Sequence, residues 1–177
     1  PSVRTVRADR PRGDRLHGPS ARESYYKFSV NKNNAIRFGM GAIKGVGASA
    51  VKAIVDERKA NGSYNSIFDL SQRVDLRAAN KKAFDGLTAA GAFDSFNIDR
   101  AQYFHDNGDG ITFIENILRH GNKFQENKNS SQVSLFAGTN DLQISNPVIP
   151  DVEPWPTIEK LTKEKEVVGI YISGHPL

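Results

Sequence analysis

The sequence predicts a mainly α-helical protein with a small β-hairpin at its start and an extended, partly irregular C-terminal segment. Three observations support this prediction. Stripes of apolar residues recur at the three- and four-residue spacing of helices that bury one face. Capping residues and glycines separate these stripes, as they do at helix ends. Four prolines between residues 147 and 156 suppress regular structure late in the chain.

The composition fits one large or two small domains with a modest core, since 38% of the 177 residues are hydrophobic. No apolar run approaches the length of a membrane span. The lack of cysteine excludes disulfides, thiolate zinc sites and iron–sulfur clusters, and is compatible with a reducing cytosol. The chain begins with Pro1 and its single Met is Met40, so we expect it to be a piece of a longer protein.

Residues 1–22 differ in composition from the rest of the chain. They hold six Arg and two Asp, a net charge of +4, whereas residues 23–177 hold 18 basic and 18 acidic side chains. A stretch rich in Arg, Pro and Gly without apolar periodicity predicts a disordered tail or an artificially added segment. A basic arm that binds nucleic acid is the alternative.

A β-hairpin is the first regular element that we expect. Apolar and polar residues alternate over residues 25–30, a polar turn follows at 31–34, and apolar residues resume at 35–38. This hairpin leads into a short apolar turn that contains Met40 and Ile43.

The sequence Lys44-Gly45-Val46-Gly47 follows that turn and opens into a helix. Glycine tolerates positive φ and close approach of the backbone, so such a turn is able to expose its N–H groups. These donors lie at a helix N-terminus, where unpaired amides and the macrodipole favour an anion, and Lys44 adds a positive charge. Val46 is expected to turn inward and anchor the turn.

The helix that follows has an apolar stripe at Val51, Ile54 and Val55, and a stop signal at Asn61-Gly62. A glycine turn before an amphipathic helix is the pattern of a helix-hairpin-helix motif, which binds the nucleic-acid backbone without reading bases. Seven basic against two acidic residues between positions 27 and 59 give this segment a local charge of +5. The alternative is a purely structural turn between helices.

A second helix, turn and helix follow. Ser66 caps the first helix, with Asp69 at the spacing of a capping box, and Asn80 caps the second. This turn lacks the Gly-x-Gly pair, so we expect the second unit to pack against the first, while Lys81 and Lys82 add a phosphate contact. The sequence therefore predicts a tandem helix-hairpin-helix module.

Two more helices are expected before residue 125. Asp99 begins a helix that reaches Asp106, and a helix over residues 111–124 buries Ile114, Ile117 and Leu118.

The amino-acid composition changes from residue 121 onward. Residues 122–132 are almost entirely polar and predict a flexible linker, and a short apolar island lies at residues 132–136. A helix is expected over residues 157–168, followed by a strand-like edge at 167–172.

Several segments, in this order, closely resemble the C-terminal part of the alpha subunit of bacterial DNA polymerase III. The resemblance extends over about residues 23–177, does not include residues 1–22, and is most specific in its last segment. The segments that carry it are residues 38–47, 67–70, 90–94, 132–136 and 164–177.

The resemblance implies a domain order. Residues 23–120 are a tandem helix-hairpin-helix module that binds DNA, residues 121–156 are a linker with a clamp-binding peptide, and residues 157–177 connect to a following oligonucleotide-binding domain. Residues 1–22 lie outside the resemblance, and their composition predicts a disordered tail or an artificially added segment.

The resemblance also implies a function, namely sequence-nonspecific duplex DNA binding and sliding-clamp tethering by a replicative polymerase in the bacterial cytoplasm, which supports processive synthesis. The implied partners are duplex DNA, the sliding clamp and other replicase subunits. Residues expected to contact DNA are Lys44, Gly45, Val46, Gly47, Ser49, Lys52, Lys81 and Lys82. Residues expected to contact the clamp are Gln132, Val133, Ser134, Leu135 and Phe136.

No catalytic residue, metal site or cofactor is expected in this chain. Phosphoryl transfer needs closely placed carboxylates that hold Mg²⁺, and the acidic residues here are scattered. In the family, the catalytic aspartates and their Mg²⁺ belong to the palm, which precedes this region. Residues 106–110 place glycine at required calcium-ligand positions and predict a turn, and His105, His120 and His175 share no metal-ligand spacing.

Two alternatives come from other functional classes. A DNA-repair enzyme of the glycosylase type uses a similar hairpin with a catalytic Asp about one helix further on, for which Asp69 is the nearest candidate. Asp69 already has a capping role, and the cysteines of a cluster are absent. The other alternative is a helical protein-interaction module without a role in DNA binding.

Overall fold

The computed structural model describes residues 16–133 and 144–175. It is mostly helical with a small sheet near the start, which confirms the predicted fold class. Its elements are β1 (Leu16–His17), β2 (Ser29–Val30), β3 (Ile36–Arg37), the 3₁₀ turn η1 (Met40–Ala42), α1 (Ala48–Asn61), α2 (Ile67–Arg73), α3 (Lys81–Ala89), the 3₁₀ turn η2 (Asp94–Phe96), α4 (Arg100–Tyr103), α5 (Phe113–Val133) and α6 (Thr157–Val168).

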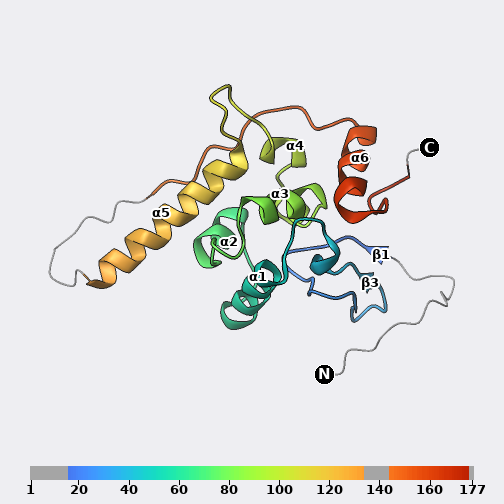
Figure 1. Ribbon diagram of the computed structural model, residues 1–177, viewed down its shortest axis with the longest axis horizontal. Helices are drawn as coiled ribbons and strands as arrows, with labels where there is room; N and C mark the ends of the chain where they lie inside the picture. The colour runs from blue at the N-terminus through green and yellow to red at the C-terminus, as the bar shows by residue number, and fades with distance from the viewer. Residues whose placement is uncertain (1–15, 134–143, 176–177) are drawn as a thin grey trace.

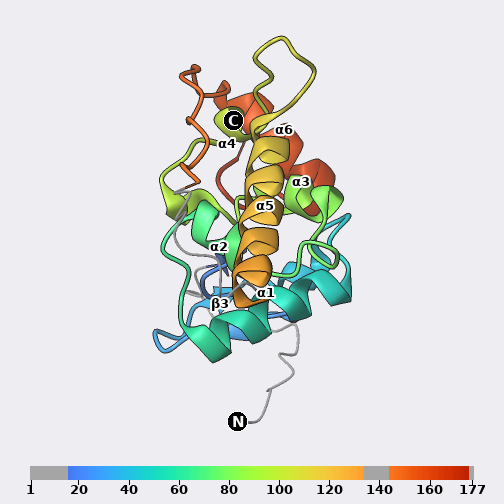
Figure 2. The ribbon, with the colours of Figure 1, turned by 90° about the vertical axis from the view of Figure 1, so that its left-hand side faces the viewer.

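The central element of the fold is α3. It contacts α5 on one side and α6 on the other, and α5 also packs along α2 (Figures 1 and 2). Side chains from these helices and from α1 form one apolar core in which Ile54, Phe84, Leu87, Ile114 and Ile117 are completely buried. The core therefore fixes α1 and the turn before it relative to α3.

The predicted β-hairpin is confirmed, with shorter strands. β2 pairs antiparallel with β3, so that Val30 lies opposite Ile36. Asn34 closes the turn with a φ of 60°, a conformation that Asn adopts more readily than most residues.

The prediction of a disordered tail is wrong for residues 16–22, which are ordered in the structure. Leu16 pairs with Ile36 in a parallel register, which adds β1 to the sheet. Ala21 is completely buried, and its N–H donates to the carbonyl of Ala92 at 2.9 Å. The average composition of the first 22 residues hides these few packing positions.

The predicted helix caps at Ser66, Asn80 and Asp99 are confirmed. Their side chains accept hydrogen bonds from backbone amides in the first turns of α2, α3 and α4. α4 ends at Tyr103, earlier than expected. The Asp106 carboxylate instead accepts from the amides of Gly108 and Gly110, which closes the predicted turn.

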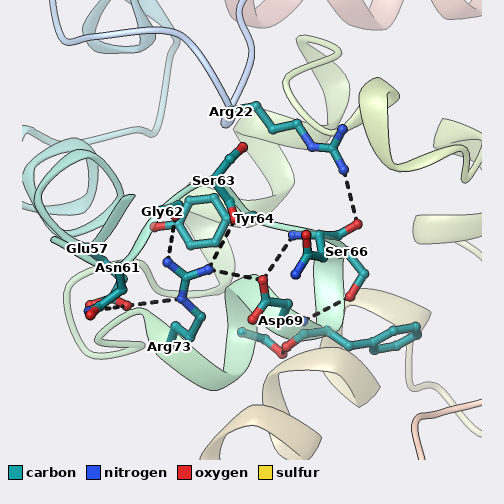
Figure 3. Close-up of polar contacts among 12 residues, drawn as sticks. Arg22, Glu57, Asn61, Gly62, Ser63, Tyr64, Ser66, Asp69 and Arg73 are labelled. Carbon is teal, nitrogen blue, oxygen red and sulfur yellow. Dashed lines mark hydrogen bonds and ion pairs between the residues drawn. The ribbon is translucent and has the colours of Figure 1, made fainter. Parts of the chain in front are cut away.

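Arg73 joins the end of α1 to α2 (Figure 3). Its guanidinium donates to Glu57 Oε1 and to Asp69 Oδ2, both at 3.0 Å, and lies 4.6 Å from the centre of the Tyr64 ring. The Tyr64 hydroxyl in turn donates to the carbonyl of Ile54 at 2.6 Å. These contacts fix the orientation of α1 against the second helical unit.

The prediction of a flexible linker is wrong for residues 121–133, because α5 continues as a helix to Val133. Gly121 allows this helix to cross α2 closely, because a Cβ at that position would lie 2.4 Å from the Ser71 carbonyl oxygen. Gln125 Nε2 donates to the carbonyls of Ser71 and Val74, each at 2.9 Å. Polar contacts hold this part of α5 in place, so the sequence shows no apolar stripe from which the helix could be predicted.

Helix α6 has the predicted bounds, whereas the strand-like edge over residues 167–172 is absent from the described part of the chain. Gly169 ends α6 with a φ of 85°. The amides of Ile172 and Ser173 then donate to the Glu164 carboxylate, at 2.6 and 2.8 Å, rather than to a neighbouring strand.

Candidate nucleic-acid interface

The N-terminus of α1 is open to solvent. Gly47, Ala48 and Ser49 are exposed, and no side chain caps the helix at Gly47. Among the described residues, the amides of these three positions have no hydrogen-bond acceptor. Unpaired amides and the positive end of the helix dipole favour an anion at this position.

The turn before α1 is partly committed to internal hydrogen bonds. The Lys44 amide donates to the Val167 carbonyl at 2.8 Å, and the Val46 amide donates to the Ile43 carbonyl at 3.1 Å. Val46 is buried, as expected for an anchor. The prediction that the whole turn exposes its amides is therefore wrong for Lys44 and Val46, whereas the amides of Gly45 and Gly47 have no acceptor among the described residues.

The two glycines of the turn differ in what the fold requires of them. Gly45 has a φ of 85°, a conformation that L side chains rarely adopt. Gly47 has an ordinary φ of −76°, and a Cβ there would meet only the Ser49 Oγ, at 3.9 Å. No contact with a described residue demands a glycine at position 47, which leaves space for the close approach of a ligand.

Helix α3 brings a second lysine to this turn. A Cβ at Gly86 would lie 2.7 Å from the Lys44 carbonyl oxygen, so the glycine lets α3 pack directly on the turn. The same packing places Lys82 beside Gly45, where a Cβ would meet the Lys82 Cγ at 3.4 Å. Lys44 and Lys82 are both exposed and form no ion pair with any described residue.

The other predicted lysines are already paired. Lys81 contacts Asp85 at 2.9 Å within α3, and Lys52 contacts Asp56 within α1. Exposed pairs of this kind contribute little to stability and exchange readily for another anion. Because each is paired with an aspartate, Lys52 and Lys81 contribute less net positive charge to the site than Lys44 and Lys82 do.

Part of the local positive charge supports the fold instead. Arg58 donates to the carbonyls of Ala21 and Ser24 at 2.8 and 2.9 Å, and Arg37 contacts the Glu23 carboxylate. Burial lowers the pKa of Arg58, which still remains a cation at neutral pH.

The second turn offers fewer donors than the first. The Asn80 side chain accepts the hydrogen bond of the Ala83 amide at 3.1 Å and so uses one of the free amides of α3. This supports a packing role for the second unit.

One carboxylate oxygen of Asp69 is engaged in structural contacts. Its Oδ2 accepts from the Asn65 amide at 2.9 Å as well as from Arg73 (Figure 3). This argues against the repair-enzyme alternative. Within residues 16–133 and 144–175, no three His, Cys, Asp or Glu side chains gather into a possible metal site.

The predicted clamp-binding residues fall largely outside the described structure. Gln132 and Val133 lie in the last turn of α5, and Ser134, Leu135 and Phe136 belong to the residues that the structure leaves out. Their role stays a prediction. None of the described helices is both long and apolar enough to cross a membrane.

Sequence reasoning missed Gly86, Trp155 and Lys163, which come from other elements and line one cavity together with Lys44 and Gly45 of the turn. Gly86 carried a signal, since a glycine inside a helical pattern often marks close packing. Trp155 stacks on Phe104 with ring centroids 5.5 Å apart, and Lys163 lies over the Trp155 ring. Contacts so distant in sequence leave no local pattern.

Known proteins resemble this chain over most of its length. DNA polymerase III subunit alpha of Thermus aquaticus is 34% identical over 172 residues, which cover 97% of this chain and 13% of that protein. The same subunit of Neisseria meningitidis serogroup A is 35% identical over 159 residues, 89% of this chain. That of Xylella fastidiosa strain Temecula1 is 33% identical over 162 residues.

The chain spans 13% of the length of these relatives. The predicted similarity to the alpha subunit is thus confirmed. A family model described as a helix-hairpin-helix motif matches residues 13–103, so the expectation that residues 1–22 lie outside the match is wrong from residue 13 onward. With about half of its length in that match and an open helix N-terminus after the glycine turn, the chain belongs to the helix-hairpin-helix motif family.

Proposed function

We propose that this chain is the duplex-DNA-binding segment of a replicative DNA polymerase in the bacterial cytoplasm. The observation that carries the proposal is the open N-terminus of α1, where Gly47, Ala48 and Ser49 present unpaired amides beside Lys44 and Lys82. The similarity to polymerase alpha subunits supports it independently.

The proposed grip acts on phosphate. Backbone amides and lysine ammonium groups donate hydrogen bonds to phosphate oxygens, which position a protein on the duplex without carrying sequence information. The free amides belong to the first turn of a 14-residue helix that Arg73 and the core hold in place. The site is therefore organised before DNA arrives.

The clamp-binding peptide adds a second contact in this proposal. The Gln132 amide pairs with backbone groups at a pocket rim, and Leu135 and Phe136 fill an apolar socket on the sliding clamp. Burying two such side chains contributes at most about 3 to 6 kcal/mol before the entropy of ordering is subtracted. The far end of α5, which leads to this peptide, points away from the core (Figure 1).

Two weak contacts on one chain become strong together. Nonspecific duplex binding has a Kd of about 10⁻⁴ to 10⁻⁶ M at physiological salt. If the clamp encircles the duplex that the hairpin holds, the second contact is intramolecular and avidity rises by about 10² to 10⁴. Other replicase subunits complete the assembly in this proposal.

Duplex titration over a range of salt concentrations tests the DNA-binding proposal. We expect a linear fall of log K with log salt, with a slope that corresponds to about two to four phosphates. We also expect equal affinity for duplexes of unrelated sequence. A salt-independent affinity, or a strong preference for one sequence, contradicts a phosphate grip.

Replacing Leu135 and Phe136 with Ala tests the clamp contact. We expect the double variant to bind purified sliding clamp at least about tenfold more weakly, because two apolar anchors are lost, with unchanged duplex affinity. The matched control replaces two apolar side chains that the structure shows as exposed, Val148 and Ile158, with Ala. Equal clamp binding by both double variants contradicts the assignment.

A further inference from the structure

A cavity of about 370 Å³ opens beside the glycine turn. Helices α3 and α6 form two of its walls, and the chain segments that carry Phe104 and Trp155 close another side. Lys44 and Gly45 belong both to the turn and to the cavity lining. The cavity is thus continuous with the proposed duplex site.

The lining combines aromatic rings with cations. Phe104 and Trp155 stack at an angle of 22°, and both rings contribute to the cavity. Lys163 Nζ lies 4.8 Å from the centre of the Trp155 ring, and Lys44 and Lys82 reach the cavity from the side of the turn. Aromatic rings flanked by lysines are the pairing that binds the bases and phosphates of single-stranded nucleic acid.

Asp85 adds an unmatched hydrogen-bond acceptor to the same lining. Its Oδ2 pairs with Lys81, but its Oδ1 is buried and has no hydrogen-bond partner among the described residues. Buried acceptors are rarely left unpaired in native proteins. Because this oxygen is buried, it would accept a hydrogen bond from an N–H group of a nucleobase only after the Asp85 side chain turns toward the cavity.

We propose that this cavity holds an unpaired nucleotide of a single strand that continues from the duplex on α1. The base packs against Phe104 and Trp155, and its phosphate contacts Lys82 and Lys163. This inference rests on the proposed function, because it is the duplex that delivers the strand to the cavity. Three lysines in the lining outnumber its two acidic residues, Asp85 and Glu166. This charge and the shared Lys44 favour a nucleotide over an apolar peptide.

The fluorescence of Trp155 tests the proposal, because it is the single tryptophan of the chain. Three DNA probes are compared with the full chain: a blunt duplex, the same duplex with an oligothymidylate extension, and that duplex with an abasic extension of equal length. We expect the thymidylate extension alone to quench Trp155 and to raise affinity by about tenfold, the size of one base–aromatic stack. Equal effects of the abasic extension overturn the proposal.

A pair of variants on α6 provides the second readout. Lys163→Ala removes a lysine of the cavity, whereas Lys160→Ala removes the same charge from the same helix outside this cavity. With labelled DNA, we expect Lys163→Ala to reduce the gain from the thymidylate extension and to leave blunt-duplex affinity unchanged. Identical behaviour of the two variants overturns the proposal.

The outcomes separate this inference from the proposed function. If the blunt duplex fails to bind while an isolated oligothymidylate quenches Trp155, the duplex proposal fails and the nucleotide site stands. If the blunt duplex binds and neither extension changes Trp155 fluorescence, the nucleotide site fails alone.

Discussion

Replacing Gly47 with Glu is expected to weaken duplex binding by about thirtyfold to several hundredfold, the loss of one or two charge-assisted hydrogen bonds. The new carboxylate lies where a phosphate would meet the free amides of Ala48 and Ser49. A negative charge at a helix N-terminus is favourable for the helix itself. The fold should therefore survive while the DNA site is lost, a split that thermal unfolding and fluorescence anisotropy measure side by side.

Two control variants sharpen this test. Gly47→Ala adds a Cβ that, among the described residues, meets only the Ser49 Oγ, so any loss of affinity reports contact with DNA rather than a changed fold. Ser63→Glu makes the same charge change just beyond the other end of α1. The two positions are about 20 Å apart along a helix of this length, about twice the distance over which 0.1 M salt screens a charge. An equal loss in Gly47→Glu and Ser63→Glu means that net charge, rather than the open helix end, determines binding.

Local signals predicted the parts of the fold that local interactions determine. Ser66, Asn80 and Asp99 satisfy amides three or fewer residues away, so their identity alone marks the helix starts. The bounds of α6 follow from a dense helical composition between Pro156 and Gly169.

Long-range contacts produced the differences. The second half of α5 is held by Gln125 and by the close crossing at Gly121, neither of which gives an apolar stripe. The stretch after Gly169 consists of residue types that favour strands, but the Glu164 carboxylate accepts the hydrogen bonds of the Ile172 and Ser173 amides. A pattern specifies which groups need partners and not which partners they find.

The candidate site likewise has features that the sequence predicts and one that depends on a long-range contact. The glycine turn, the helix after it and the inward Val46 follow from the sequence. The hydrogen bond from the Lys44 amide to Val167 does not, because it joins residues more than a hundred positions apart. It removes one predicted donor from the site and ties the turn to α6.

A buried ion pair holds α6 in that position. Arg100 Nη1 lies 2.9 Å from Glu164 Oε2, with 3% and 0% of the two side chains exposed. Burial alone would raise the pKa of the Glu164 carboxyl, but hydrogen bonds from Ser173, Ile172 and Arg100 outweigh burial and leave the pKa below its ordinary value. The carboxylate is therefore ionised at neutral pH and fully paired.

Glu164→Gln is expected to lower the free energy of unfolding by about 3 kcal/mol, near the lower end of the range for a broken buried pair, because Asp94 still contacts Arg100 at 2.7 Å. Glu159→Gln makes the same change on the exposed face of α6, where Glu159 pairs with Lys163 at 3.7 Å, and should cost at most about 1 kcal/mol. Urea unfolding of both variants measures the difference. Equal stability of the two variants contradicts a structural role for the buried pair.

The same variant has an expected pH signature. Because the folded pKa of Glu164 is depressed, its stabilisation is complete above the ordinary pKa of a glutamate and is lost as the pH falls through the folded value. Wild-type stability should therefore fall more steeply on the acid side than that of Glu164→Gln. The variant should also bind duplex severalfold more weakly under conditions in which it is folded, because Val167 of α6 no longer holds the Lys44 amide as firmly. Unchanged duplex affinity in a destabilised Glu164→Gln protein would show that the turn keeps its shape without α6.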